Sequence, residues 1–183
     1  MTRRNDRYNH RGNVAVEGET DLRKVAQAKY DDAIKGRPEL CVSGSEDNTM
    51  FIWDGANSKK PVGARITGHQ KPIMYVSYSP DGRYIASGSN DKSAKIWDGR
   101  TGKFMGSLRG HVGPVYRLTW APDSRMVVTA SEDSTMKLWN LKTYKMTIEL
   151  PGHSGSVYAC DWAPNGATVA SGGADKTLKL WKQ

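Results

Sequence analysis

The chain has few cysteines and no long apolar run. Among its 183 residues only Cys41 and Cys160 carry thiols, and their spacing fits neither a disulfide framework nor a metal-binding pair. This scarcity favours a reducing compartment, the cytosol or the nucleus, over secretion. No segment reaches the roughly 18 apolar residues of a membrane-spanning helix, and the polar first residues lack the apolar core of a secretory signal. We therefore expect no membrane partner.

Positive charge is in excess. Lysine and arginine together number 27 against 19 acidic residues, which gives a formal net charge of +8. Such a balance favours an acidic partner such as RNA, although a basic surface is also common on proteins that bind no nucleic acid. Hydrophobic residues make up 37% of the chain, which is enough for an ordinary core. Composition alone leaves the function open.

A repeat of 42 to 44 residues organises the sequence. Its tryptophans, Trp53, Trp97, Trp139 and Trp181, are 44, 42 and 42 residues apart and end four segments that align without gaps: SGSEDNTMFIWD, SGSNDKSAKIWD, TASEDSTMKLWN and SGGADKTLKLWK. A Gly-His pair recurs, with its histidine 28 residues before each of the last three tryptophans. A Gly-His to Trp-Asp period of about 40–45 residues is the signature of WD40 repeats. The chain resembles that family, so we predict an all-β propeller segment of about four blades.

Within each repeat the apolar residues alternate as they do in β-strands. Ala94 and Ile96 alternate with lysine, the period of a half-buried strand. In the strand after each Gly-His pair the alternation slips, because the large apolar residues Val115, Leu118 and Trp120 begin with a gap of three. One extra residue restores the phase, so the sequence predicts a β-bulge at this place in each repeat.

The units at the two ends are incomplete. The first has Val25 where the Gly-His pair is expected, so it lacks its innermost strand, and the last ends before its outermost strand. Two exposed sheet edges result, and we expect the isolated chain to associate. The predicted organisation is a polar stretch over 1–39 with a helical insertion at about 21–35, then repeats at about 40–67, 68–109, 110–151 and 152–183. The helix is interpreted as a surface insertion in a blade or as a partner-binding element.

Histidine, serine or threonine, and aspartate recur once in each repeat, and together they are the ingredients of a hydrolase triad. A catalytic site is usually built once and also needs an oxyanion site, whereas a packing device is built once per blade. We therefore predict structural tetrads in which Asp, His, the hydroxyl and the Trp indole form a hydrogen-bonded chain, with no catalytic residue, metal, cofactor or small-molecule substrate. The tetrads are His69, Ser87, Asp91 and Trp97; His111, Thr129, Asp133 and Trp139; and His153, Ser171, Asp175 and Trp181, with a partial set of Ser43, Asp47 and Trp53.

Longer stretches resemble one WD40 family in particular. LCVSGSEDNTMFIWD, KKPVGARITGHQ and NDKSAKIWDGRTGKFMGSLRGHVGPVY, with the N-terminal RYNHRGNVAVEGETDLRKVAQAKYDDAIKG, resemble the C-terminal half of the Notchless family of ribosome-assembly factors. The resemblance implies an eight-bladed propeller in the nucleus and nucleolus that acts on the large ribosomal subunit precursor, with its proteins and rRNA as partners. It also implies contact with a midasin-type ATPase, made only through a ubiquitin-like domain that has no counterpart in this sequence.

Two sets of surface residues follow from a propeller with binding loops on its rims. Bulge and turn residues suit a protein interface, with plain blade packing as the alternative, and basic loop residues suit RNA phosphates, with a solvated surface as the alternative. The alternative functions are a ubiquitin-ligase substrate receptor, for which no adaptor segment is visible, a Notch-type signalling scaffold, and a hydrolase, which would need one set unlike the others. The protein-binding candidates are Met74, Tyr116, Tyr158, Glu46, Asn90 and Glu132, and the RNA-contacting candidates are Lys59, Lys60, Arg65, Lys71, Arg100 and Lys103.

Overall fold

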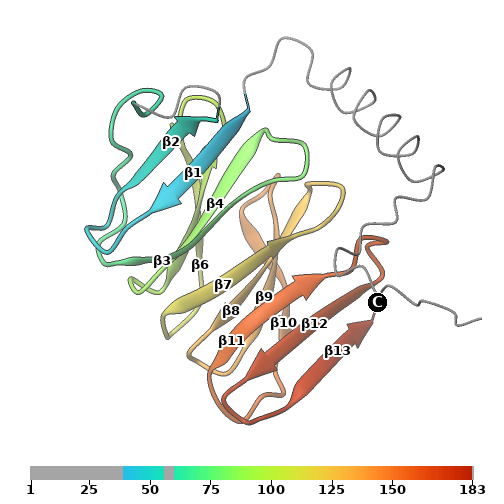
Figure 1. Cartoon of the computed structure of the whole chain (residues 1–183). Coiled ribbons are helices and arrows are strands. Elements are labelled where there is room, and N and C mark those ends of the chain that lie inside the picture. Colours follow the sequence, from blue (N-terminus) through green and yellow to red (C-terminus); the bar gives the residue numbers. More distant parts are fainter. Residues whose placement is uncertain (1–38, 56–59, 183) are drawn as a thin grey trace, which may run out of the picture. The chain divides into compact units, whose positions relative to one another are not determined.

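The computed structural model describes residues 39–55 and 60–182, and these form antiparallel sheets without a helix (Figure 1). The predicted helix at 21–35 and Lys59 lie outside the described residues. In chain order the sheets have two, four, four and three strands, which confirms the predicted all-β propeller segment. The strands are β1 (Leu40–Gly44), β2 (Met50–Asp54), β3 (Ile73–Tyr78), β4 (Tyr84–Ser89), β5 (Ser93–Asp98), β6 (Phe104–Arg109), β7 (Val115–Trp120), β8 (Met126–Ser131), β9 (Met136–Asn140), β10 (Lys145–Leu150), β11 (Val157–Trp162), β12 (Thr168–Gly173) and β13 (Leu178–Lys182).

Each four-stranded sheet is a meander in which consecutive strands pair. The orders are β3-β4-β5-β6 and β7-β8-β9-β10, while β1-β2 and β11-β12-β13 form the sheets at the two ends. The strand β2 extends its sheet by two isolated bridges, from Met50 to Ile66 and from Trp53 to Pro61. The segment after β2 therefore follows the course of a fourth blade strand without forming a continuous ladder.

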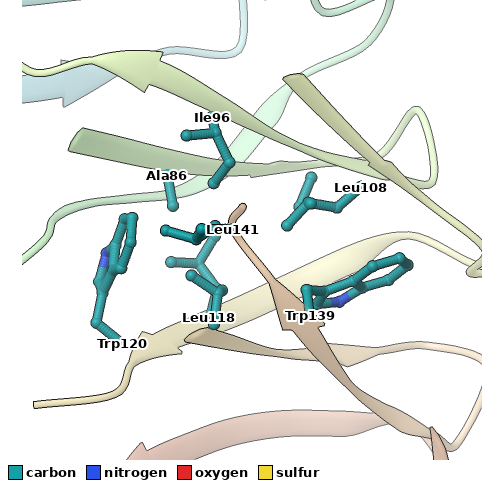
Figure 2. Packing of buried hydrophobic residues seen from close by; sticks show 9 residues of the cluster. Ala86, Ile96, Leu108, Leu118, Trp120, Trp139 and Leu141 are labelled. Atoms are coloured by element: carbon teal, nitrogen blue, oxygen red, sulfur yellow. The ribbon is translucent and has the colours of Figure 1, made fainter. Parts of the chain in front are cut away.

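The sheets stack face to face, and the core lies between them in three layers. The first strands β3, β7 and β11 contact one another in turn along the inner side of the stack (Figure 1). Figure 2 shows the middle layer, in which side chains from the β3–β6 sheet meet those from the β7–β10 sheet. Removing these side chains from water supplies the stabilising free energy that holds neighbouring blades together. The labelled residues of this layer are Ala86, Ile96, Leu108, Leu118, Trp120, Trp139 and Leu141.

The predicted β-bulges are confirmed in all three strands that follow a Gly-His pair. The pairing of β3 with β4 shifts register between Ile73 and Tyr75, so Met74 is the extra residue. The same shift brackets Tyr116 in β7 and Tyr158 in β11. The shift turns the next apolar residue back toward the core, which explains the gap of three in the sequence pattern.

The interpretation of the third strand of each blade as half-buried was wrong for the two middle sheets. Lys95 in β5 is only 7% exposed, and Lys137 in β9 only 5%. Each of these strands has a sheet neighbour on both edges, and the long aliphatic stem of lysine can cover apolar surface while its ammonium group stays near water. In β13 exposure does alternate, but in the opposite sense: Leu178 is 73% and Leu180 63% exposed, while Lys179 between them is half-buried.

Candidate functional site

The tetrad of the β3–β6 sheet is a continuous hydrogen-bonded chain. The Trp97 indole N–H donates to Ser87 Oγ over 2.8 Å, and Ser87 Oγ lies 2.7 Å from His69 Nε2. Because Oγ accepts from the indole, its own proton is left to donate to Nε2, and the proton of the ring then sits on Nδ1. That N–H donates to Asp91 Oδ2 over 2.8 Å, and the tetrad thereby links β4, β5 and the segment before β3.

The other two complete tetrads repeat this geometry closely. From histidine to aspartate, histidine to hydroxyl and indole to hydroxyl, the distances are 2.8, 2.7 and 2.8 Å in the set of His111. They are 2.9, 2.7 and 2.9 Å in the set of His153. In the first sheet the Trp53 indole donates to Ser43 Oγ over 2.8 Å, and Asp47 accepts from the backbone and hydroxyl of Thr49. Val25, where the sequence has no histidine, lies outside the described residues.

Burial and hydrogen bonding fix the charges in the tetrads. Burial lowers the pKa of His69 below its usual range against the pull of Asp91, so the ring is neutral near pH 7. Burial opposes ionisation of Asp91, but hydrogen bonds from Ser93, the Gln70 backbone and His69 outweigh it and hold the pKa of the carboxyl at about 2. The tetrad therefore contains one carboxylate and a neutral imidazole.

This arrangement does not suit nucleophilic catalysis. Ser87 and Thr129 are fully buried and Ser171 is 2% exposed, so none of these hydroxyls faces a substrate. Each hydroxyl already accepts from an indole N–H, and all three sets are alike, whereas a catalytic set would be unique and would open into a cleft. The hydrogen bonds instead satisfy polar groups that would otherwise be buried without partners.

Two further positions of the repeat support the tetrads: a hydroxyl that was not singled out from the sequence, and the glycine of the Gly-His pair. The hydroxyl two residues after each aspartate, such as Ser93, donates to the carboxylate oxygen that histidine does not use. The glycine before each histidine is needed because Gly68 has a φ of 151° and a Cβ there would lie 2.9 Å from the Trp97 ring. Both signals are visible as columns in the aligned repeats. The equivalent hydroxyls are Thr49, Thr135 and Thr177.

The candidate protein-binding residues lie at one end of the sheets, which we call the tetrad rim and which comprises the Gly-His segments, the bulges and the turns that carry the tetrad aspartates. Met74 is 45% and Tyr158 56% exposed. The rings of Tyr116 and Tyr158 lie 5.4 Å apart, and the Tyr116 hydroxyl donates to Glu132 over 2.8 Å. That hydrogen bond raises the pKa of Tyr116. The structure therefore brings Tyr116, Tyr158 and Glu132 together across two blades.

The remaining two members of that set lie in turns of the same rim. Glu46 is exposed, and Asn90 is half-buried with its backbone N–H donating to Pro72. The Asn90 Oδ1 atom is buried and accepts no hydrogen bond within residues 39–55 and 60–182.

The candidate RNA-contacting residues are all exposed where they are described, but they do not form one patch. Arg65 and Lys71 lie toward the tetrad rim. Lys60, Arg100 and Lys103 lie at the opposite rim, where the Pro-Asp-Gly turn and the β5–β6 turn meet through the Gly99 to Arg83 backbone hydrogen bond. The sequence pattern could not separate the two groups, because it does not say toward which end of a blade each loop points.

A hollow of about 410 Å³ lies along the inner strands β3, β7 and β11. The Arg117 guanidinium stacks over the Tyr75 ring at 4.2 Å, and Trp120 and Trp162 also line the hollow. Across the described ranges no three histidine, cysteine or acidic side chains are placed to share a metal ion, and no helix there has the length and apolarity to cross a membrane. Both cysteines are free thiols.

The repeated tetrads and bulges agree with a comparison of the sequence with known families. The model of the family described as "WD domain, G-beta repeat" matches residues 33–54, 60–98, 102–140 and 144–182. The chain belongs to the WD40 repeat family. Complete tetrads occur in three of the four matched repeats, so they do not distinguish one repeat of this WD40 chain from another.

Three relatives resemble the chain over about half its length. Ribosome assembly protein 4 of Saccharomyces cerevisiae is 46% identical over 91 residues, which cover 48% of this chain and 18% of the relative. The Notchless protein homolog of Arabidopsis thaliana is 46% identical over 87 residues, with the same coverage. Ribosome assembly protein 4 of Chaetomium thermophilum is 49% identical over 91 residues, 48% of this chain and 17% of the relative. These matches confirm the resemblance to the Notchless family, and the matched segment spans less than a fifth of each relative.

Proposed function

We propose that this WD40 chain is a non-enzymatic scaffold in the assembly of the large ribosomal subunit, acting in the nucleus and nucleolus. Its similarity to two proteins named ribosome assembly protein 4 carries the proposal. The tetrads support a scaffold over an enzyme, because their hydroxyls are buried and engaged. The function then rests on surface contacts with pre-ribosomal proteins and rRNA.

The tetrad rim is the proposed protein contact. Tyr116 and Tyr158 present two aromatic rings side by side, and aromatic residues and methionine are enriched at the centres of protein interfaces. Met74 adds an exposed thioether on the same rim. The bulges also lie within paired strands, so their backbone does not need to be ordered when a partner binds.

Contact with rRNA is proposed for the basic residues, in two groups because they lie on two rims. Neutralising phosphates releases counterions, so this part of the affinity falls steeply as salt rises and carries no sequence preference. Arg65 and Lys71 would act at the tetrad rim, and Lys60, Arg100 and Lys103 at the opposite rim.

Sedimentation tests the proposal. The tagged chain should co-sediment in a sucrose gradient with precursors of the large subunit and not with those of the small subunit. Changing Arg65 and Lys71 together to alanine removes the basic candidates of the tetrad rim, and changing Lys60, Arg100 and Lys103 together removes those of the opposite rim. The variant that loses salt-dependent binding identifies the rim that contacts RNA. Sedimentation only at the top of the gradient, away from every precursor particle, contradicts the proposed function, and binding that does not change with salt contradicts the RNA contact.

A further inference from the structure

One buried lysine has no acidic partner where its counterpart in the next blade has one. Lys137 in β9 is 5% exposed and forms an ion pair with Glu149 over 2.8 Å, because these two residues face each other in the β9–β10 ladder. Lys95 in β5 is 7% exposed and occupies the same position, but its ladder partner in β6 is Ser107. Among the described residues its ammonium group forms no ion pair, and it lies 5.4 Å from the Phe104 ring.

Lys95 borders a hollow of about 520 Å³ on the tetrad rim. Lys71, Lys92 and Arg109 also line this basic hollow, and Asp91 is the acidic residue in its lining. Four cations against one carboxylate leave a net charge of +3 at neutral pH. The charge of Asp91 favours the ammonium form of Lys95, but its oxygens are hydrogen-bonded to its tetrad and turn partners and form no ion pair with the four cations among the described residues.

The charges around Lys95 favour the binding of an anion beside it. Burial lowers the pKa of its ammonium group, Asp91 opposes this effect, and Arg109 adds to it by repulsion. An isolated buried charge is costly unless it is paired. An anion that entered the hollow would meet several cations at once and would relieve the repulsion between Lys95 and Arg109.

We propose that the basic hollow binds the phosphate of a phosphorylated serine or threonine in a partner protein. A phosphomonoester carries about −1.5 to −2 charges at pH 7 and three free oxygens at the tip of a flexible side chain, so it can reach the ammonium group of a lysine that is only 7% exposed. An RNA phosphodiester carries one charge and is held by the chain on both sides, which suits open basic grooves. The inference goes beyond ribosome assembly and does not depend on it.

Ser107 offers a test at a half-buried position of the outer strand β6, where the next blade carries a glutamate. A glutamate there faces Lys95 as Glu149 faces Lys137, so Ser107→Glu should pair with Lys95 and lower the net charge around the hollow from +3 to +2, while Ser107→Gln has the same size and no charge. Calorimetry on the full chain uses a short phosphoserine peptide, its unphosphorylated form and a single-stranded RNA oligomer. We expect selective binding of the phosphopeptide, weakened about tenfold or more by Ser107→Glu and much less by Ser107→Gln. In 15N-labelled protein the phosphopeptide should also raise the pKa of the Lys95 amine.

Three results would overturn the proposal. The first is equal binding, or none, of the phosphorylated and unphosphorylated peptides. The second is the same affinity for the phosphopeptide in Ser107→Glu and Ser107→Gln. The third is binding of the RNA oligomer, but not of the phosphopeptide, that Ser107→Glu abolishes, which would assign the hollow to an RNA phosphate instead. None of these results bears on sedimentation with ribosomal precursors, so this proposal and the proposed function can fail separately.

Discussion

At the scale of single residues, the recurring histidine, hydroxyl, aspartate and tryptophan act on stability. Each set joins two strands and a loop through buried hydrogen bonds, and its members cannot be removed singly without leaving an unsatisfied polar group. The resemblance to a hydrolase triad extends to the Asp–His–hydroxyl connectivity, but here each hydroxyl is buried and accepts a hydrogen bond from an indole N–H.

Replacing the tetrad aspartate should destabilise the protein. Asp133→Ala removes the acceptor of the His111 ring and of the Thr135 hydroxyl, so we expect a loss of about 1–3 kcal/mol in the free energy of unfolding. Urea unfolding followed by tryptophan fluorescence measures it. Asp123→Ala, in an exposed turn where the carboxylate accepts from the Arg125 backbone, is the control and should cost little. Equal midpoints for the two variants would refute the structural role of the tetrad.

The glycine before the histidine should be equally sensitive. In Gly68→Ala the new Cβ would lie 2.9 Å from the Trp97 ring in a backbone conformation with φ at 151°, and crowding and strain together should cost about 1–3 kcal/mol. Gly172→Ala is the matched control, because nothing lies within 4 Å of a Cβ there. Thermal melting of both variants decides the matter, and a tolerated Gly68→Ala would contradict the close approach.

The tetrads should make stability fall in acid. The pKa values of His69 and His111 are lowered in the folded chain, so the unfolded chain binds more protons once the pH drops below about 6.5, the usual histidine value. Asp91 and Asp133, with pKa values of about 2 in the folded state, add a second loss as the pH falls below about 4. Urea midpoints should decrease from pH 7 to 5 and further toward 3, and a midpoint that rises over this range would contradict the assigned charges.

Sequence reasoning succeeds for residues that repeat and fails for those whose environment differs between blades. The tetrad residues and the bulges could be located because the same pattern occurs three times. The burial of Lys95 could not be predicted in this way. Strand periodicity separates the two faces of one strand, but it does not show that a neighbouring blade and an outer strand cover both faces. Its difference from Lys137 depends on the ladder partners Ser107 and Glu149, whose pairing register only the structure provides.

At the scale of elements, each strand is stabilised by the neighbouring sheet as well as by its own. Met136 in β9 is fully buried in the layer between the β7–β10 and β11–β13 sheets. Leu178 in β13 is the same position one repeat later, and it is 73% exposed. The face of β13 that carries Leu178 and Leu180 thus matches a face that in the preceding blade is covered.

The 183-residue chain should therefore associate when it is purified alone. Exposed leucines lie beside the edge of β13 that pairs with no other described strand, and they favour pairing with other chains. Changing Leu178 and Leu180 together to lysine should reduce the associated fraction in sedimentation velocity without altering the strand content. Val112→Lys, at an equally exposed apolar position outside the strands, is the control and should change nothing. A single 20.2 kDa species in the unmodified chain would contradict the prediction.

At the scale of the whole molecule, the interior and the rim of the WD40 repeats differ in how much they vary from blade to blade. The interior repeats from blade to blade, so it specifies a shape and no particular partner. The rim differs between blades: methionine at one bulge, tyrosines at two, and a basic hollow lined by residues of the β3–β6 sheet and its turns. We expect specific recognition by this chain to depend on those differences.

The most direct test of this account is to remove exposed rim side chains and measure binding and folding together. Met74→Ala with Tyr158→Ala takes two exposed side chains from the tetrad rim, and Met146→Ala with Ile148→Ala takes two of similar exposure from the outer strand β10. The account predicts that the rim pair weakens co-sedimentation with large-subunit precursors by about tenfold or more at an unchanged urea midpoint, while the β10 pair binds normally. Normal binding by the rim pair, or an equal loss in both pairs, would contradict it.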